Sequence, residues 1–250
     1  MVSDKRKPKS STANSKYQPS ATSSRTTYIL GGVAVAIIVA LIVGGLVWNN
    51  SQDDGGGVDE AVLSENAALI IGEPSAPQTI DVFEDFMCPV CQEFEEQSGT
   101  AITEAINNGS LRVRYHMLTF LDDRSASGDY STRAAGAAQC VGTGEDKEVF
   151  EKFHTALFTN QPEEGGDSDL SNADMARLAG AQGASPQTQQ CVADGARVTE
   201  ATEASEQSRN QLAKATGGQV ATPTVLSGGE PVNGIMDGTG WLDQLLNEQG

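Results

Sequence analysis

The chain has 250 residues and is strongly acidic: 34 Asp and Glu residues against 16 Lys and Arg residues give a formal net charge of −18. An acidic surface repels polyanions, which excludes nucleic acid and anionic lipid as general partners. Six of the basic residues lie in the first 27 positions, so the rest of the chain carries 10 basic and 33 acidic side chains. This acidity agrees with a soluble exported domain but names no partner.

The N-terminus carries a predicted tail and a predicted membrane span. Residues 1–27 are rich in Ser, Thr, Lys and Pro and have almost no large apolar side chains, which predicts disorder. Residues 28–48 (YILGGVAVAIIVALIVGGLVW) contain no charge and are long enough to cross a bilayer as one helix. Because basic residues precede this run, the positive-inside rule places the tail in the cytoplasm and everything after Trp48 outside. The sequence therefore predicts a single-pass cell-membrane protein with an extracytoplasmic domain.

A cleaved signal peptide is the main alternative to this span. The apolar run is longer than a usual signal-peptide core, and no small-x-small cleavage motif follows it before residues 49–51. No cysteine lies near its end, so a lipid attachment there is not supported either. An uncleaved signal anchor is the favoured interpretation.

One folded domain is expected after a short linker. Residues 49–60 (NNSQDDGGGVDE) contain three consecutive glycines and several acids, a composition typical of a flexible tether. Residues 61–250 have the length of a single domain and show no internal repeat. Runs rich in Ile, Val and Leu predict three strands, and an amphipathic pattern from Cys91 to about Asn107 predicts a helix between the second and third. The expected strands are 68–71, 78–84 and 111–117.

The second half of the domain is mainly helical before it returns to strands. Its Ala- and Gln-rich stretches predict a helical insertion over about residues 125–216. The helices expected there are 129–141, 146–158, 172–181 and 186–216. Two short strands and a last helix follow, at 224–226, 231–233 and 241–247. This alternation predicts an α/β fold with an inserted helical subdomain.

The motif Cys88-Pro89-Val90-Cys91 is the candidate for catalytic chemistry. Its two thiols stand where the predicted strand ends and the predicted helix begins. Backbone N–H groups and the positive end of the helix would face Cys88 and favour its thiolate. The spacing also allows the second sulfur to close on the first as a reversible disulfide, which can pass to another protein through a mixed disulfide. Cys88 and Cys91 are therefore the predicted redox residues.

The segment around this motif, residues 82–91 (VFEDFMCPVC), resembles the active site of DsbA-like thioredoxin-fold proteins. In that family a βαβ unit is followed by a helical insertion, a cis-proline loop, a β-hairpin and a last helix, the order predicted over residues 65–248. Together with the span, the resemblance implies a membrane-anchored thiol:disulfide oxidoreductase of the actinobacterial type. It also implies that residues 221–225 (ATPTV) form the cis-proline loop, where Thr222 and Pro223 expose backbone that can pair with an extended substrate. A simple proline turn entering a strand is the alternative.

Two further cysteines, Cys140 and Cys191, fall in different predicted helices. Outside the membrane an even cysteine count favours pairing, so we expect a structural disulfide between them. A second redox pair is the competing interpretation. A zinc site made by all four cysteines is disfavoured because structural zinc sites usually have two closely spaced pairs, and no metal or other cofactor is expected. His116 and His154 are interpreted as packed or half-exposed side chains rather than as ligands or proton relays.

Two features depart from the strong oxidants of the family. Val90 stands where the best-known enzymes carry a histidine that stabilises the thiolate. Several acids would raise the Cys88 pKa if their carboxylates lie near the sulfur, although they are also compatible with a solvated helix face. These acids are Glu84, Asp85, Glu93, Glu95 and Glu96. Val82 also replaces the buried acid that many of these enzymes keep beneath the second cysteine, so we expect Glu84 or water to take the Cys91 proton.

The favoured function is an extracytoplasmic thiol oxidase that donates the Cys88–Cys91 disulfide to reduced exported proteins. A disulfide reductase or isomerase is the alternative, and a non-catalytic thioredoxin-fold binding module is a second one. The resemblance further implies reoxidation by a quinone-linked membrane partner such as a vitamin K epoxide reductase-like protein. Anchoring would keep the two proteins in one membrane plane.

Overall fold

The structure is a computed structural model that describes residues 58–247 of the chain. The predicted tail, the predicted membrane span and most of the predicted linker lie outside the described residues. Within residues 58–247, no helix combines the length and the apolar character that a membrane crossing requires.

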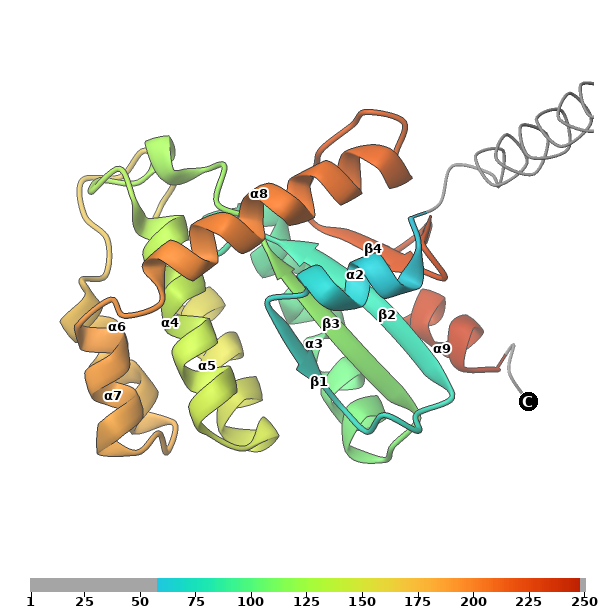
Figure 1. The fold of residues 1–250 in the computed structure, drawn as a ribbon, viewed down its shortest axis with the longest axis horizontal. Coiled ribbons are helices and arrows are strands. Elements are labelled where there is room, and N and C mark those ends of the chain that lie inside the picture. The colour runs from blue at the N-terminus through green and yellow to red at the C-terminus, as the bar shows by residue number, and fades with distance from the viewer. Residues whose placement is uncertain (1–57, 248–250) are drawn as a thin grey trace, which may run out of the picture. The chain divides into compact units, whose positions relative to one another are not determined.

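Two parallel strands form the centre of a five-stranded mixed sheet (Figure 1). β2 (Gln78–Glu84) pairs with β3 (Leu111–Met117) along its whole length, and Glu84 lies opposite Met117. Nearly all residues of both strands are buried, as expected for central strands that helices cover on two faces. The carboxyl ends of β2 and β3 therefore meet, and the chain leaves β2 at this point toward Cys88.

Three shorter strands complete the sheet, whose order is β1-β3-β2-β4-β5. β1 (Leu69–Ile71) pairs with β3, and β4 (Thr224–Ser227) pairs with β2, both in antiparallel orientation. β5 (Glu230–Pro231) forms a hairpin with β4. The predicted strand 231–233 was thus placed slightly too far along the chain.

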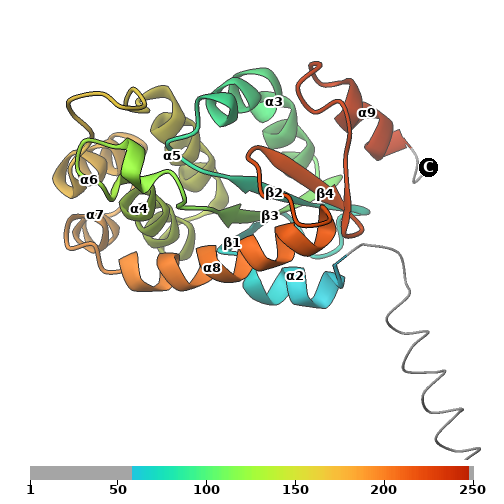
Figure 2. The ribbon, with the colours of Figure 1, turned by 90° about the horizontal axis from the view of Figure 1, so that it is seen from above.

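Helices cover both faces of the sheet (Figure 2). α3 (Pro89–Asn107) and α9 (Gly240–Asn247) lie on one face, while α2 (Glu60–Asn66) and α8 (Val198–Ala215) lie on the other. Apart from α8, the helical insertion lies beside the sheet and extends from the side of β1 and α3 (Figure 1). The predicted α/β class with an inserted helical part is confirmed.

The insertion contains more helices than the sequence pattern indicated. A short 3₁₀ helix, η1 (Asp122–Arg124), precedes the α-helices. The α-helices are α4 (Tyr130–Gly144), α5 (Lys147–Thr159), α6 (Asn172–Ala181), α7 (Pro186–Ala193) and α8. The single helix predicted over 186–216 is wrong, because the chain breaks between α7 and α8. Gly195 has a φ of 61° there, a left-handed conformation that suits glycine and ends a helix.

The domain also begins earlier than the composition suggested. Val58 is buried and its N–H donates to the carbonyl oxygen of Gly229 (3.4 Å). Asp59 caps α2 by accepting a hydrogen bond from the N–H of Ala61 (2.7 Å). The last three residues of the predicted linker 49–60 therefore belong to the folded domain, and α2 was not predicted.

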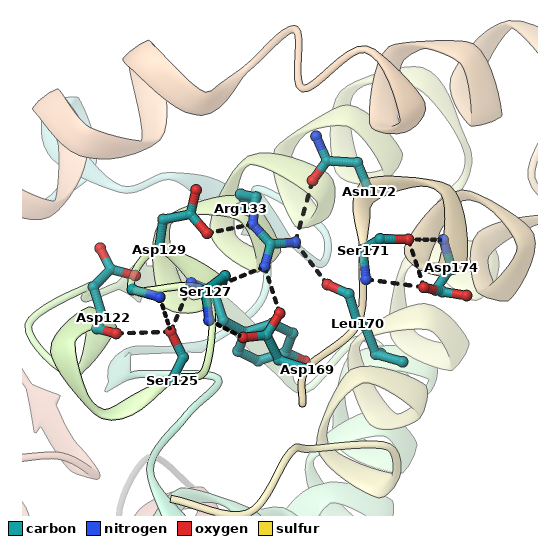
Figure 3. Close-up of polar contacts among 12 residues, drawn as sticks. Asp122, Ser125, Ser127, Asp129, Arg133, Asp169, Leu170, Ser171, Asn172 and Asp174 are labelled. Atoms are coloured by element: carbon teal, nitrogen blue, oxygen red, sulfur yellow. Dashed lines mark hydrogen bonds and ion pairs between the residues drawn. The ribbon is translucent and has the colours of Figure 1, made fainter. Parts of the chain in front are cut away.

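Arg133 of α4 fixes the long connection between α5 and α6 (Figure 3). Its guanidinium donates to Asp169 (2.7 Å), to the carbonyl oxygen of Leu170 (2.6 Å) and to Asp129, the N-cap residue of α4 (2.6 Å). Asp169 has a side chain that is only 5% exposed, so this pair is shielded from solvent. The network sets the path of a segment whose first part, at Gln161, reaches the Cys88 motif.

A buried polar network lies under α8 on the other face of the sheet. Asp81 accepts two hydrogen bonds from Arg114 (2.8 and 2.6 Å) and contacts His116 Nε2 (2.8 Å), while His116 Nδ1 lies 3.0 Å from the Ser208 hydroxyl. Burial lowers the pKa of His116 even though Asp81 opposes the change, so the ring is neutral at pH 7. Asp81, His116 and Ser208 are at most 1% exposed, which makes this Ser-His-Asp arrangement structural rather than hydrolytic.

Candidate active site

The Cys88 motif occupies the junction predicted for it. Cys88 is the N-cap residue of α3, Pro89 is in the first turn, and Cys91 follows within the same turn. Proline suits the start of a helix because its φ is preset and the first N–H groups have no helical partner. Cys91 is fully buried, Cys88 is 7% exposed and Val90 is 45% exposed. Cys88 is therefore the sulfur that another protein can reach first.

Local hydrogen bonds favour the thiolate of Cys88. The Cys91 thiol is the largest contribution, and it outweighs burial; the Thr222 side chain and the backbone N–H groups of Cys91 and Val90 add to it. Together they lower the pKa of Cys88 from 9.0 to about 6. The helix start thus stabilises the thiolate even though Val90 offers no side-chain donor.

Cys91 has the opposite character. Burial raises its pKa well above the ordinary value, and its hydrogen bond to Cys88 and the charge on Glu84 act in the same direction. One sulfur of the pair is therefore a stable thiolate and the other a thiol. This asymmetry suits a disulfide that another thiolate attacks at Cys88. The reduced pair is then stable, with Cys88 as a thiolate and Cys91 as a buried thiol.

The Thr222–Pro223 peptide bond is cis, as the resemblance implied. The loop lies beside the motif because β4 begins at Thr224, which pairs with Phe83 of β2. Cys88 Sγ is 3.5 Å from the carbonyl oxygen of Thr222. The structure thus brings together the two chain segments, 134 residues apart, that were predicted to form the site.

Glu84 is also close to the cysteine pair, but its surroundings differ from those of a solvated acid. It is the last residue of β2, only 1% exposed, and one of its oxygens contacts His154 Nε2. Burial raises the pKa of Glu84, although His154 opposes the rise. Asp85 is likewise buried, whereas Glu93 and Glu96 are exposed. A solvated helix face is therefore confirmed for the latter two and wrong for Glu84 and Asp85.

His154 was interpreted from the sequence as a packed or half-exposed side chain. In the structure it is also a functional candidate. Packing is confirmed: the ring lies 4.9 Å from Tyr115 and 5.6 Å from Phe86, centroid to centroid. Its contacts with the carboxylates of Glu84 and Glu95 were not predicted. The available signal was its place on the apolar side of an amphipathic helix, since a buried histidine needs polar partners.

Cys140 and Cys191 form the predicted disulfide. It joins α4 to α7, with 5.9 Å between the Cα atoms. Cys88 and Cys91 are free thiols. Because the second pair is bonded to itself, it supplies no ligands to a zinc site shared by the four cysteines.

Comparisons with known proteins agree with this geometry. The family model described as "Thioredoxin" matches residues 64–245. The chain belongs to the thioredoxin family. Among solved structures, MdbA, a thiol-disulfide oxidoreductase from Corynebacterium diphtheriae, is 30% identical, with a TM-score of 0.63 over 72% of this chain and 90% of that one. DsbA from Mycobacterium tuberculosis is 28% identical, with a TM-score of 0.54 over 74% and 96% of the two chains.

A longer curated relative also matches the chain. The serine/threonine-protein kinase PknE of Mycobacterium tuberculosis is 37% identical over 187 residues, which is 72% of this chain. The chain spans about a third of the length of this relative (32%). The family model and the solved structures agree on a DsbA-like thioredoxin fold for this domain.

One further residue of this thioredoxin-family site carried no sequence signal. Gln161, just after α5, donates its amide hydrogens to the carbonyl oxygens of Phe86 (2.9 Å) and Cys88 (3.0 Å). It thereby binds the backbone at the motif's first cysteine and two residues before it. A glutamine in a polar loop is unremarkable in sequence, and only the path of the insertion brings it here.

Proposed function

We propose that this chain is a membrane-anchored thiol oxidase whose extracytoplasmic domain donates the Cys88–Cys91 disulfide to reduced exported proteins. The observation that carries the proposal is the contrast between Cys88, with a pKa lowered to about 6, and Cys91, with a pKa raised by burial. At pH 7 such a Cys88 is mainly thiolate. A stable thiolate favours the reduced protein, which makes its disulfide a ready oxidant of other thiols.

The reaction starts from the closed disulfide. A client thiolate attacks Cys88 Sγ, the Cys88–Cys91 bond breaks, and Cys91 leaves with the electron pair and gains a proton. A second client thiolate then attacks the client sulfur of the mixed disulfide, and Cys88 leaves as its stabilised thiolate. The client has lost two electrons as a disulfide, and the Cys88–Cys91 pair has gained them as a dithiol.

Two surface features support a polypeptide as the substrate. The Thr222 backbone beside Cys88 offers an edge to which an extended segment can add as a strand. Val90 within the motif is an exposed apolar side chain, and so is Phe120 in the loop after β3. That loop contacts the segment just before the motif, since the N–H of Leu121 donates to the Asp85 carboxylate (3.1 Å). An unfolded client presents both the extended backbone and the apolar side chains that such a surface binds.

The location and the electron acceptor complete the proposal. The apolar run at residues 28–48 supports an uncleaved anchor, with the basic tail in the cytoplasm. Each cycle leaves a dithiol that must lose two electrons before the next client. A quinone-linked membrane enzyme, such as a vitamin K epoxide reductase-like protein, is a suitable acceptor because anchoring keeps both proteins in one plane.

The redox potential tests the direction of the reaction. The full-length protein, purified in detergent, is equilibrated with glutathione buffers, and the fraction of Cys88–Cys91 disulfide is measured by thiol alkylation and mass spectrometry. A potential well above roughly −200 mV is the expected result for an oxidase. A value near or below roughly −270 mV would overturn this proposal and indicate a disulfide reductase instead.

A further inference from the structure

A buried acid–histidine–acid cluster extends from the cysteine pair to a groove between α3 and α5. Glu84 contacts His154 Nε2, and His154 Nδ1 lies 3.7 Å from the carboxylate of Glu95. The side chains of Glu84, His154 and Glu95 are 1%, 4% and 10% exposed. The three residues come from β2, α5 and α3, so the helical insertion contributes the central member.

The inner end of the cluster lies at Cys91. Glu84 precedes Asp85, whose backbone amide contributes to the hydrogen bonding of the Cys91 sulfur. The charge on Cys88 raises the pKa of Glu84, and the charge on Glu84 raises the pKa of Cys91. The Oε2 atom of Glu84 is buried and has no hydrogen-bond partner among the described residues. This oxygen is therefore free to hold a proton or to accept one.

The outer end of the cluster lies in a groove of about 870 Å³ between α3 and α5. Glu95 lines this groove and accepts a hydrogen bond from the Thr155 hydroxyl (2.7 Å). A glycine four residues along α3 makes room for its carboxylate: a Cβ atom at position 99 would lie 2.6 Å from the Glu95 carboxylate. Gly99 thus allows Glu95 to fold back toward His154 while still reaching the groove.

The protonation states of the three residues favour Glu84 as the group that gains and loses a proton. Burial alone would lower the pKa of His154, but Glu84 and Glu95 outweigh it and raise the pKa to about 10. Burial would raise the pKa of Glu95, yet His154 and Thr155 hold it below its usual value. His154 is therefore cationic and Glu95 ionised at pH 7, and their charges offset each other. Glu84, with a raised pKa, is the remaining acid.

The other ionisable groups around this cluster do not compete for that role. Tyr115 of β3 packs on the ring of His154, and burial raises its pKa well above the usual value. Glu151 of α5 influences the cluster only through its charge, and no contact between it and Glu84 occurs among the described residues. The remaining neighbours are the two thiols of the motif and Asp85, whose carboxylate accepts hydrogen bonds from the N–H groups of Met87 and Leu121.

We propose that Glu84 exchanges a proton with Cys91 and that His154 and Glu95 connect Glu84 to the water of the α3–α5 groove. This inference rests on the proposed thiol-disulfide exchange. When a client opens the disulfide, the Cys91 thiolate takes a proton from the Glu84 carboxyl group, and water in the groove restores that proton through Glu95 and His154. When a mixed disulfide closes, Cys91–SH gives its proton to Glu84, the Cys91 sulfur bonds to Cys88, and the bound thiol leaves with the electron pair of the broken bond.

The closing reaction provides a direct test. The full-length protein is loaded at pH 4 with glutathione on Cys88, and a pH jump to values between 6 and 10 starts closure by Cys91. Acid quenching and mass spectrometry give the closure rate. Glu84→Gln should close roughly 100-fold more slowly at pH 7, the usual contribution of a positioned proton acceptor. Because Cys91 ionises without help at high pH, the two rates should come within about threefold at pH 10.

Two variants keep this test independent of folding effects. Gly99→Ala keeps every member of the cluster and raises helix propensity, but it displaces the Glu95 carboxylate, so we expect closure at pH 7 to slow by about 3- to 10-fold. Glu93→Gln is the matched control, since it removes an exposed acid that lies on the same helix as Glu95 but does not line the groove; its closure rate should equal that of the wild type.

The outcomes separate this inference from the proposed function. Equal closure rates for the wild type and Glu84→Gln across the pH range would overturn the proton exchange alone. A Glu84→Gln defect that persists unchanged at pH 10 would also overturn it, because that pattern indicates a structural role. A wild-type protein that neither accepts glutathione on Cys88 nor closes would overturn the proposed function as well.

Discussion

The Cys88 sulfur lies 3.5 Å from the carbonyl oxygen of Thr222, so the two segments that define the site meet at the reactive atom. The carbonyl can accept a hydrogen bond only from the protonated thiol, whereas the Thr222 side chain favours the thiolate. The lowered pKa of Cys88 shows that donors prevail, and the Cys91 thiol is the strongest of them. Reactivity at Cys88 therefore depends more on its partner cysteine than on the dipeptide between them.

Replacing the partner cysteine should change the titration of Cys88. We expect Cys91→Ala to raise the Cys88 pKa from about 6 by roughly one unit or more, because the largest stabilising hydrogen bond is lost. Thiolate absorbance at 240 nm as a function of pH measures the change. Cys91→Ser is the control: its hydroxyl group keeps a donor and should retain part of the effect. An unchanged titration in Cys91→Ala would show that the helix start alone sets the pKa.

The lowered pKa of Cys88 predicts how the free energy of unfolding of the reduced protein depends on pH. The pKa of Cys88 is lower in the folded reduced protein than in the unfolded chain, so its contribution is fully present above about pH 9 and is lost as the pH falls through about 6. The reduced form should therefore gain stability relative to the oxidised form between pH 5.5 and about 8.5. Thermal unfolding of both forms across this range measures the difference. Cys88→Ser cannot form the disulfide, so its stability is compared with that of the oxidised wild type. The pH dependence of that difference should vanish, and its persistence would assign it to another group.

Local features of this site could be predicted because they depend on neighbours in sequence. The strand before Cys88 and the helix after it are encoded by a β-branched run and an amphipathic run only a few residues from the motif. The break between α7 and α8 was missed because Gly195 lies in a stretch whose Ala, Gln and Glu content favours helix on both sides. A prediction from the composition of a long stretch does not detect a helix end that depends on the left-handed conformation of one residue.

The contacts that tune the site could not be predicted in the same way. Glu84 and His154 are 70 residues apart, and each looks like an ordinary member of its own strand or helix. Their contact depends on how the insertion packs against the end of β2, which no local pattern specifies. Gln161 illustrates the same limit, since its position depends on a connection that Arg133 holds in place.

The disulfide between α4 and α7 should stabilise the domain without taking part in exchange. It closes a loop across 51 residues, and restricting the unfolded chain to this extent is worth roughly 2–4 kcal/mol. We expect the double variant Cys140→Ala/Cys191→Ala to lose about this free energy of unfolding, measured by urea denaturation. Its Cys88–Cys91 pair should keep the redox potential of the wild type. A large shift of that potential would instead support a redox role for the second pair.

The network at Asp81 should be the most sensitive buried polar site on the opposite face of the sheet. Asp81→Asn leaves the Arg114 guanidinium buried, with its main anionic partner removed, and it also weakens the contact with His116. Removing one partner of a buried ion pair typically costs about 3–5 kcal/mol, so we expect a loss of that size in urea denaturation.

Glu60→Gln is the matched control for this prediction, because it removes the other carboxylate that contacts Arg114. The Glu60 side chain is 51% exposed, and an exposed pair of this kind contributes less than about 1 kcal/mol. The two variants remove the same type of charge from the same guanidinium and differ mainly in burial. Similar losses for both would show that solvent reaches Arg114, and would contradict a dry network beneath α8.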